Sequence, residues 1–156
     1  MRTLVAYYSR TGTTKILAEA LAKALEADID EIIDQKSRRG KLGYMRAARD
    51  AKGEKLTEIK VNRNPEDYGL VLIGTPIWWG SLTPAVRTYL KQFSWKDRTL
   101  AFFITSGGED RTLVFEQMQE LVEGSQVLGT FGLTTEQVKA GDFEAQLTDF
   151  LQKVKS

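Results

Sequence analysis

The chain has 156 residues and a formal net charge of +1, and its composition is 42% hydrophobic and 28% charged. These values are typical of one globular domain with a core of its own, and the small charge gives no general attraction to nucleic acid or to an anionic membrane. Cysteine and histidine are both absent, which excludes disulfides, thiolate metal sites and thiol nucleophiles and removes the commonest general base. A redox function would therefore need a bound cofactor.

The N-terminal segment runs directly into a strand-like stretch, and its apolar run is too short for the core of a signal peptide. No apolar run along the chain approaches the length of a membrane span. We therefore expect a single cytoplasmic domain over residues 1–156, with no membrane and no nucleic-acid partner.

Strand-like and helical patterns alternate along the chain. Short apolar runs bounded by turn residues predict buried strands, and apolar residues at helical spacing predict helices. In chain order we first expect a strand at Leu4–Tyr8, then a helix with an apolar stripe of Ile16, Leu17, Ala20, Leu21, Ala24 and Leu25, and then a short strand at Ile29–Ile33. A strand at Gly69–Gly74 and a helix at Pro84–Phe93 follow. The last expected elements are a strand at Leu100–Ile104, a helix at Leu113–Val122, a strand at Gln126–Leu133 and an amphipathic helix over Phe143–Val154.

This alternation predicts an α/β fold: a three-layer, doubly wound, five-stranded parallel sheet with helices on both faces and right-handed crossovers. One segment is unlike the rest. Between Lys36 and Lys55 the chain carries eight basic residues against two acidic ones, and the sequence around Tyr44 has the pattern of a basic helix.

Ligands of open α/β sheets bind beyond the carboxyl ends of the strands, so the loops after the strong strands carry the functional signal. The first loop offers four hydroxyls around a glycine and then opens a helix: Ser9, Arg10, Thr11, Gly12, Thr13 and Thr14. A helix N-terminus presents free N–H groups and a partial positive charge, both of which favour a phosphate. Helix capping by one hydroxyl is the alternative, but four hydroxyls exceed what a cap needs. The loop lacks the lysine of a Walker motif and the three glycines of a dinucleotide fingerprint.

The second loop places two tryptophans side by side between proline and glycine. Its candidate binding residues are Thr75, Pro76, Ile77, Trp78, Trp79 and Gly80. An indole gains stacking energy against a flat ring system. One tryptophan could instead plug the core, but we expect at least one of the two to face a ligand.

The third loop, Thr105, Ser106, Gly107 and Gly108, follows the strand at Leu100–Ile104. Paired glycines expose backbone N–H and C=O groups to a ligand edge. An ordinary turn with Asp110 as the cap of the next helix is the alternative.

Taken together, the three loops resemble those of the flavodoxins over nearly the whole chain. The first loop matches the family's phosphate pattern at Ser9, Thr11, Gly12 and Thr14. The second matches the family's Gly-Thr-Pro-x-Trp at residues 74–78 and runs on to Pro84 and Arg87. The third matches the family's Thr-Ser-Gly-Gly at residues 105–108. The resemblance implies strand order 2-1-3-4-5 and a non-covalent FMN at the point where the order reverses.

In such a protein the FMN phosphate lies in the first loop and the isoalloxazine ring between the second and third. The resemblance also implies a peptide, at Trp79-Gly80 here, whose carbonyl turns to accept a hydrogen bond from flavin N5–H. Counting from the strand end favours Trp78 over Trp79 as the stacking ring. Glu109 and Asp110 are candidates for disfavouring the anionic, fully reduced flavin by charge repulsion.

The sequence departs from many flavodoxins in two ways. Many are strongly acidic and steer toward basic partners, whereas this chain is near neutral. Many also hold the flavin between two aromatic rings, but the third loop here has none, so one face is either open or covered by another residue such as Tyr44.

Two functions remain open. The chain is either an electron carrier between redox partner proteins, as a monomer or weak dimer, or an FMN-dependent NAD(P)H reductase of quinones or similar small molecules. For the reductase, Arg38, Arg39 and Lys41 could hold a nicotinamide phosphate. A flavin-free phospho-receiver needs carboxylates at its strand ends, and Tyr8-Ser9 and Gly74-Thr75 offer none.

Overall fold

The computed structural model describes residues 2–36, 40–108 and 110–155. Its centre is a parallel sheet in which the strands lie in the order β2-β1-β5-β7-β8. These strands are β1 (Thr3–Tyr7), β2 (Asp28–Glu31), β5 (Leu70–Trp78), β7 (Thr99–Ser106) and β8 (Gln126–Thr134). When only these five parallel strands are numbered in chain order, their order in the sheet is 2-1-3-4-5, which confirms the predicted fold.

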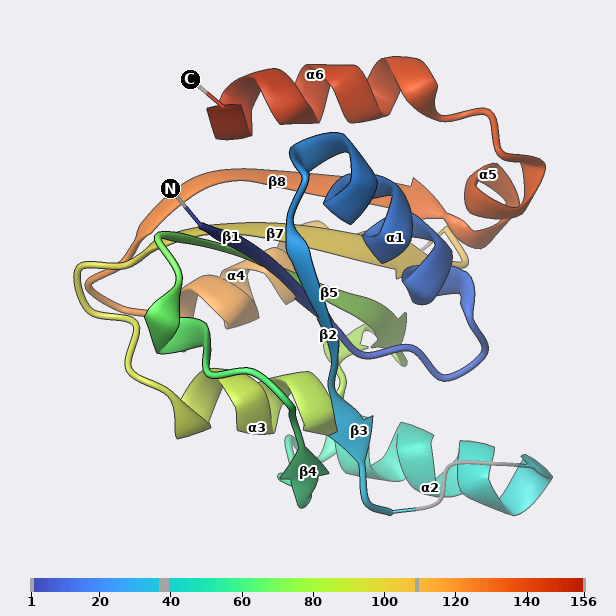
Figure 1. The fold of residues 1–156 in the computed structure, drawn as a ribbon. Coiled ribbons are helices and arrows are strands. Elements are labelled where there is room, and N and C mark those ends of the chain that lie inside the picture. Colours follow the sequence, from blue (N-terminus) through green and yellow to red (C-terminus); the bar gives the residue numbers. More distant parts are fainter. Residues whose placement is uncertain (1, 37–39, 109, 156) are drawn as a thin grey trace.

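Helices cover both faces of the sheet (Figure 1). On one face lie α1 (Thr13–Leu25) and α6 (Glu144–Lys155), and on the other lie α3 (Pro84–Gln92) and α4 (Thr112–Glu120). The remaining helices are α2 (Gly40–Lys52), which contacts α3, the short 3₁₀ helix η1 (Pro65–Asp67), and α5 (Thr135–Ala140), which follows β8 directly.

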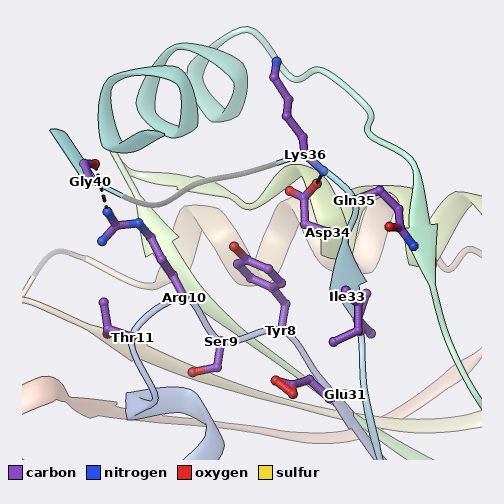
Figure 2. A pocket seen from close by; sticks show the side chains of 11 residues that line it. Tyr8, Ser9, Arg10, Thr11, Glu31, Ile33, Asp34, Gln35, Lys36 and Gly40 are labelled. Carbon is purple, nitrogen blue, oxygen red and sulfur yellow. Dashed lines mark hydrogen bonds between the residues drawn. The ribbon is translucent and has the colours of Figure 1, made fainter. Parts of the chain in front are cut away.

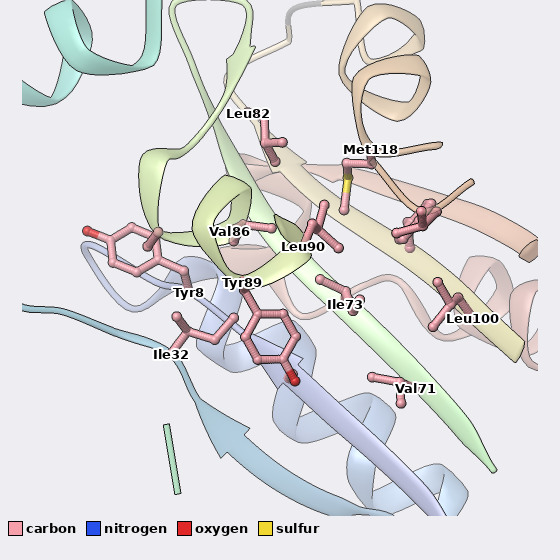
Figure 3. Close-up of a cluster of buried hydrophobic side chains, with 14 of the residues drawn as sticks. Tyr8, Ile32, Val71, Ile73, Leu82, Val86, Tyr89, Leu90, Leu100 and Met118 are labelled. Atoms are coloured by element: carbon pink, nitrogen blue, oxygen red, sulfur yellow. The ribbon is translucent and has the colours of Figure 1, made fainter. Parts of the chain in front are cut away.

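Successive strand residues point to opposite faces of the sheet, so β1, β5, β7 and β8 each supply both cores. Figure 3 shows the core under α3 and α4, where Ile73 and Leu100 of the sheet pack with Leu90 and Met118 of the helices. The opposite core joins Leu72 and Phe103 to residues of α1 and α6. Burying a side chain of this size stabilises the fold by about 1.5–3 kcal/mol, and the two cores hold the strand ends in fixed positions.

The apolar stripe expected on the first helix was partly wrong. In α1 the sheet-facing side chains include Leu17 and Leu21, as expected, together with Ala18 and Ala22. Ile16 is 46% exposed. Small alanines let the helix approach the sheet closely, whereas Ile16 lies on the flank of the helix, where the sheet does not reach.

The segment expected as one strand at residues 29–33 divides in two. β2 belongs to the central sheet, while β3 (Ile33–Asp34) pairs antiparallel with β4 (Ile59–Lys60). Between them, the backbone N–H of Ile32 donates to the carbonyl of Tyr7 at 2.7 Å. The chain leaves the sheet after this bond.

The strands before the second and third loops run further than predicted. Residues 75–78 were expected in a loop but lie in β5, because Ile77 and Trp78 pair with β6 (Ser81–Leu82) in a hairpin. Thr105 and Ser106 likewise lie in β7, where they pair with β8.

The basic segment contains a helix, α2, as its pattern indicated. Ser37, Arg38 and Arg39 lie outside the described residues. None of the helices in the described ranges combines the length and the apolar character that a membrane crossing needs.

Candidate functional site

The candidate site lies at the carboxyl ends of β1, β5 and β7. The chain moves outward from β1 to β2 and then returns to the other side of β1 with β5, so the strand order reverses here and a crevice opens between the following loops. A cavity of about 280 Å³ occupies this position. It is lined by Ser9, Arg10, Thr11, Thr13, Thr14, Tyr44, Pro76, Ile77, Trp78, Thr105, Ser106, Gly107, Thr135 and Lys139.

This cavity brings the three sequence-predicted loops together. Five of the predicted binding residues are not part of its lining: Gly12, Thr75, Trp79, Gly80 and Gly108. Of these five, Gly12, Trp79 and Gly80 are turn residues, and Thr75 lies buried beneath the cavity.

The first loop leaves the start of α1 open. Among the described residues no side chain caps the helix, because the hydroxyl of Ser9 accepts from the N–H of Gly12, at 3.0 Å, rather than from the first helical turn. Capping alone therefore does not account for the hydroxyls of this loop. The free N–H groups at the helix start form a place for an anion.

Gly12 has a φ of 99°, in the left-handed region that favours glycine. A Cβ built at this position meets no described atom within 4 Å. The backbone thus turns sharply into α1 with open space above it, which is the arrangement a tetrahedral anion requires.

A buried hydrogen bond ties the first loop to the third. The hydroxyl oxygens of Thr14 and Thr105 lie 2.8 Å apart, and both side chains are buried. The hydroxyl of Thr135 donates to the carbonyl of Ser106 at 3.3 Å. The end of β7 is therefore fixed from α1 on one side and from α5 on the other.

Gly74 and Thr75 support the site from below. A Cβ on Gly74 would lie 2.1 Å from the Phe103 ring, so only glycine allows this ring to pack across β5. The hydroxyl of Thr75 is fully buried and lies 3.0 Å from that of Thr83. Thr75 thus joins β5 to the start of α3.

The two tryptophans take different places. Trp78 lines the cavity and meets Tyr8 edge-on, with ring centroids 5.4 Å apart. Trp79 is 62% exposed and, with Gly80, lines a neighbouring groove of about 430 Å³.

Trp79 and Gly80 form the two-residue turn between β5 and β6, with φ values of 52° and 71°. Positive φ at both central residues is what a type I′ hairpin turn requires. A tryptophan in this region is strained, and such strain clusters at functional sites.

Helix α2 reaches the same cavity through Tyr44. Its ring lies under the guanidinium of Arg10, 5.4 Å from the ring centroid, and Arg10 Nη2 donates to the carbonyl of Gly40 at 3.4 Å. An aromatic ring from outside the three loops thus lines the cavity, in line with the suggestion that Tyr44 covers part of the site.

Thr135 and Lys139 of α5 were missed by the sequence reasoning. The signal was present, because Thr134 and Gln137 form a capping box, a pattern of threonine followed three residues later by glutamine that marks a helix start. Lys139 adds an exposed cation to the wall near Thr13 and Thr14.

Of the two acidic candidates after the third loop, Glu109 lies outside the described residues. Asp110 accepts a hydrogen bond from the backbone N–H of Thr112 at 2.9 Å. This bond, with a second from the Thr112 side chain, lowers the pKa of Asp110 below its usual value. Asp110 therefore stays ionised in the turn just before α4. The expectation that Asp110 caps this helix was wrong, because the N-cap position is Arg111 and its side chain makes no capping hydrogen bond.

A second, larger cavity of about 640 Å³ adjoins the first at Ser9, Arg10 and Thr11 (Figure 2). Its other wall is formed by Glu31, the last residue of β2, and by the chain that follows, including Gln35. The two cavities share the first loop, so a second ligand could lie beside the first. Lys41 lines a separate hollow with Arg10 and Tyr44.

Comparison with known proteins gives a family match and several structural likenesses. The family model described as flavodoxin matches residues 2–128. A flavoprotein in complex with FMN from Lactobacillus acidophilus NCFM is 26% identical, with a TM-score of 0.73 over 89% of this chain and 97% of that chain. No curated protein sequence matches the chain.

Two more distant structures share the fold. A flavodoxin from the domain Archaea is 17% identical, with a TM-score of 0.58 over 100% of both chains. A WrbA-like flavodoxin from Agrobacterium tumefaciens is 19% identical, with a TM-score of 0.56 over 80% of this chain and 74% of that chain.

Proposed function

The chain belongs to the flavodoxin family, and from that premise we propose that it binds FMN without a covalent bond and relays electrons between redox partner proteins. The observation that supports FMN most directly is the meeting of the open helix start, the Thr14–Thr105 pair and Trp78 in one cavity. When bound, FMN supplies the one- and two-electron chemistry that the side chains of this sequence cannot.

The residues present fit this cofactor. The N–H groups at the start of α1 and the hydroxyls of Thr11 and Thr13 are donors for a phosphate, and the space above Gly12 gives it room. Donor hydrogen bonds to a charged phosphate are stronger than those between neutral groups. The phosphate is thereby recognised by hydrogen bonds in addition to the exposed charge of Lys139.

The ring end of the cofactor would meet Trp78 from the hairpin and the backbone of Ser106–Gly107 from β7. An indole face excludes water and offers stacking. The Trp79–Gly80 turn lies beside it, and its left-handed backbone supports the proposal that this peptide can turn its carbonyl toward a ring N–H.

A second candidate is an FMN-dependent NAD(P)H reductase of quinones or other small molecules. The cavity of about 640 Å³ favours it, because that cavity adjoins the first loop and could hold a second ligand. Of the residues suggested for a nicotinamide phosphate, Lys41 lies near Arg10, and Arg38 and Arg39 lie outside the described residues.

The deciding experiment adds NADPH, and separately NADH, to the FMN-loaded protein without oxygen and without any reductase. A carrier keeps its oxidised-flavin absorbance over minutes, whereas dithionite, as the positive control, removes it. Bleaching by either nucleotide within seconds would establish the reductase instead. A purified protein that neither contains nor takes up FMN would refute both.

A further inference from the structure

Helix α2 presents an outward stripe of apolar and basic side chains. Lys41, Met45, Ala48 and Lys52 are spaced by three or four residues and so follow one line along the helix. Met45 is 66% exposed, and both lysines are exposed. The opposite side of α2, which includes Ala47 and Ala51, is buried against the protein.

This stripe borders the candidate cofactor cavity. Tyr44, next to the stripe, lines the cavity together with Trp78. On its other side Tyr44 forms the groove of about 430 Å³ with Ala48 and the exposed Trp79. The stripe, Tyr44 and Trp79 together form what we call the α2 surface.

The α2 surface is electropositive. The helix carries four basic residues and one acidic residue, Asp50. The Asp50 side chain is buried, and it binds Lys36 Nζ at 2.9 Å and lies 3.7 Å from Arg49 Nε. Its charge is thus paired with Lys36 and Arg49 rather than with the lysines on the outer face.

We propose that the α2 surface is the docking site for an acidic redox protein. The partner would place carboxylates against Lys41 and Lys52 and an apolar centre against Met45, Tyr44 and Trp79. An apolar centre with a charged rim is the usual composition of a protein interface, and opposite charges speed the encounter and set the orientation. The partner's redox character depends on the proposed function, whereas its acidity depends on α2 alone.

The same observations disfavour two other occupants. A two-fold dimer through this surface would bring α2 against α2, so lysines would face lysines. A bilayer is flat, whereas the groove between Tyr44 and Trp79 is concave and fits a protruding side chain of a protein.

The test compares the FMN-loaded wild-type protein with the double variant K41E/K52E. The matched control is K23E/K155E, which changes the same number of charges at exposed positions in the last turns of α1 and α6. Both helices run back along the sheet (Figure 1), so these turns lie toward the amino ends of the strands, whereas the cavity lies at the carboxyl ends. The probes are an acidic [2Fe–2S] ferredoxin and, with opposite charge, a basic c-type cytochrome.

Two readouts are needed: binding of oxidised ferredoxin by calorimetry, and flavin reduction by reduced ferredoxin in stopped flow. At low salt we expect K41E/K52E to weaken binding and slow reduction by at least about tenfold. The control variant should stay within about twofold of wild type, reduction by dithionite should not change, and added salt should remove the difference.

Several results would overturn the proposal. Equal losses of ferredoxin binding in both double variants, or tighter binding of the cytochrome than of the ferredoxin by the wild type, would show that the α2 charges do not select an acidic partner. Sedimentation of the wild type as a dimer that K41E/K52E abolishes would point to a second copy, and binding of the protein to phosphatidylserine vesicles but not to ferredoxin would point to a membrane. If K41E/K52E fails to fold by circular dichroism, K41Q/K52Q replaces it. Charge-dependent binding without flavin reduction would keep the docking site and refute the carrier function. Flavin reduction by ferredoxin that is the same in wild type and K41E/K52E would keep the carrier function and refute the docking site.

Discussion

The hydroxyl oxygens of Thr14 and Thr105 lie 2.8 Å apart, although the two residues are 91 positions apart in the chain. Thr14 belongs to the first turn of α1 and Thr105 to the end of β7. Because both side chains are buried, neither hydroxyl can exchange its partner for bulk water. The bond makes the first and third loops one wall of the cavity.

The first prediction concerns this bond. Thr14→Val keeps the shape of the side chain but leaves the Thr105 hydroxyl buried without its partner, which costs about 1–3 kcal/mol of unfolding free energy. Urea unfolding measures the loss. The double variant Thr14→Val/Thr105→Val should recover part of it, since both polar groups are then gone. A double variant as unstable as the sum of the single ones would contradict the pairing.

The second prediction separates the phosphate from the ring. Thr13→Val removes a cavity hydroxyl that we assign to the phosphate. Loss of a hydrogen bond to a charged group costs about 1.5–3 kcal/mol, so the FMN dissociation constant should rise about tenfold to a hundredfold. Riboflavin, which lacks the phosphate, should bind as before. Fluorescence titration with both ligands is the measurement, and equal weakening for the two would show that the phosphate lies elsewhere.

The third prediction concerns the close packing below the site. Gly74→Ala places a Cβ against the Phe103 ring, 2.1 Å away before any relaxation. Overpacking of this kind costs about 1–3 kcal/mol, or more. Phe103→Leu removes the ring and should restore part of the stability of Gly74→Ala in the double variant. Additive losses in thermal unfolding would mean that the ring is not the obstacle.

The fourth prediction concerns the hairpin turn. In Gly80→Ala the added Cβ meets no described atom within 4 Å, so the whole cost is the left-handed backbone, about 1–2 kcal/mol. Stepwise reduction of the FMN-loaded wild type should build a blue, one-electron-reduced flavin, and Gly80→Ala should build less of it because its peptide turns less freely. Direct passage of the wild type to fully reduced flavin would count against a switching peptide.

The sequence predicted β1, β5 and β7 well because each is buried on both faces and reads as a nearly continuous apolar run. It predicted the loops because strand ends gather at one edge of the sheet. The β5–β6 hairpin was missed, since Ser81 and Leu82 form a strand only by pairing with the end of β5. The place of Thr75 beneath the cavity was missed for a similar reason: its buried partner, Thr83, is a tertiary contact that no local pattern reveals.

The position of Tyr44 could be suggested from the sequence, but local patterns could not establish it. It depends on the path of the chain from β3 to α2 and on the contact with Arg10, and neither is encoded in the spacing of apolar residues. Lys139 was missed because α5 is short and follows β8 without a loop, so its start merged with the end of the strand pattern.

Arg10 gives the two ends of the site a thermodynamic connection. It belongs to the first loop, yet it contacts the carbonyl of Gly40 and the ring of Tyr44 on α2. A phosphate that draws Arg10 toward the loop, or a partner that shifts α2, changes the same set of contacts. Linkage then requires reciprocity: by whatever factor cofactor binding alters the affinity of α2 for a partner, that partner alters the affinity for the cofactor by the same factor.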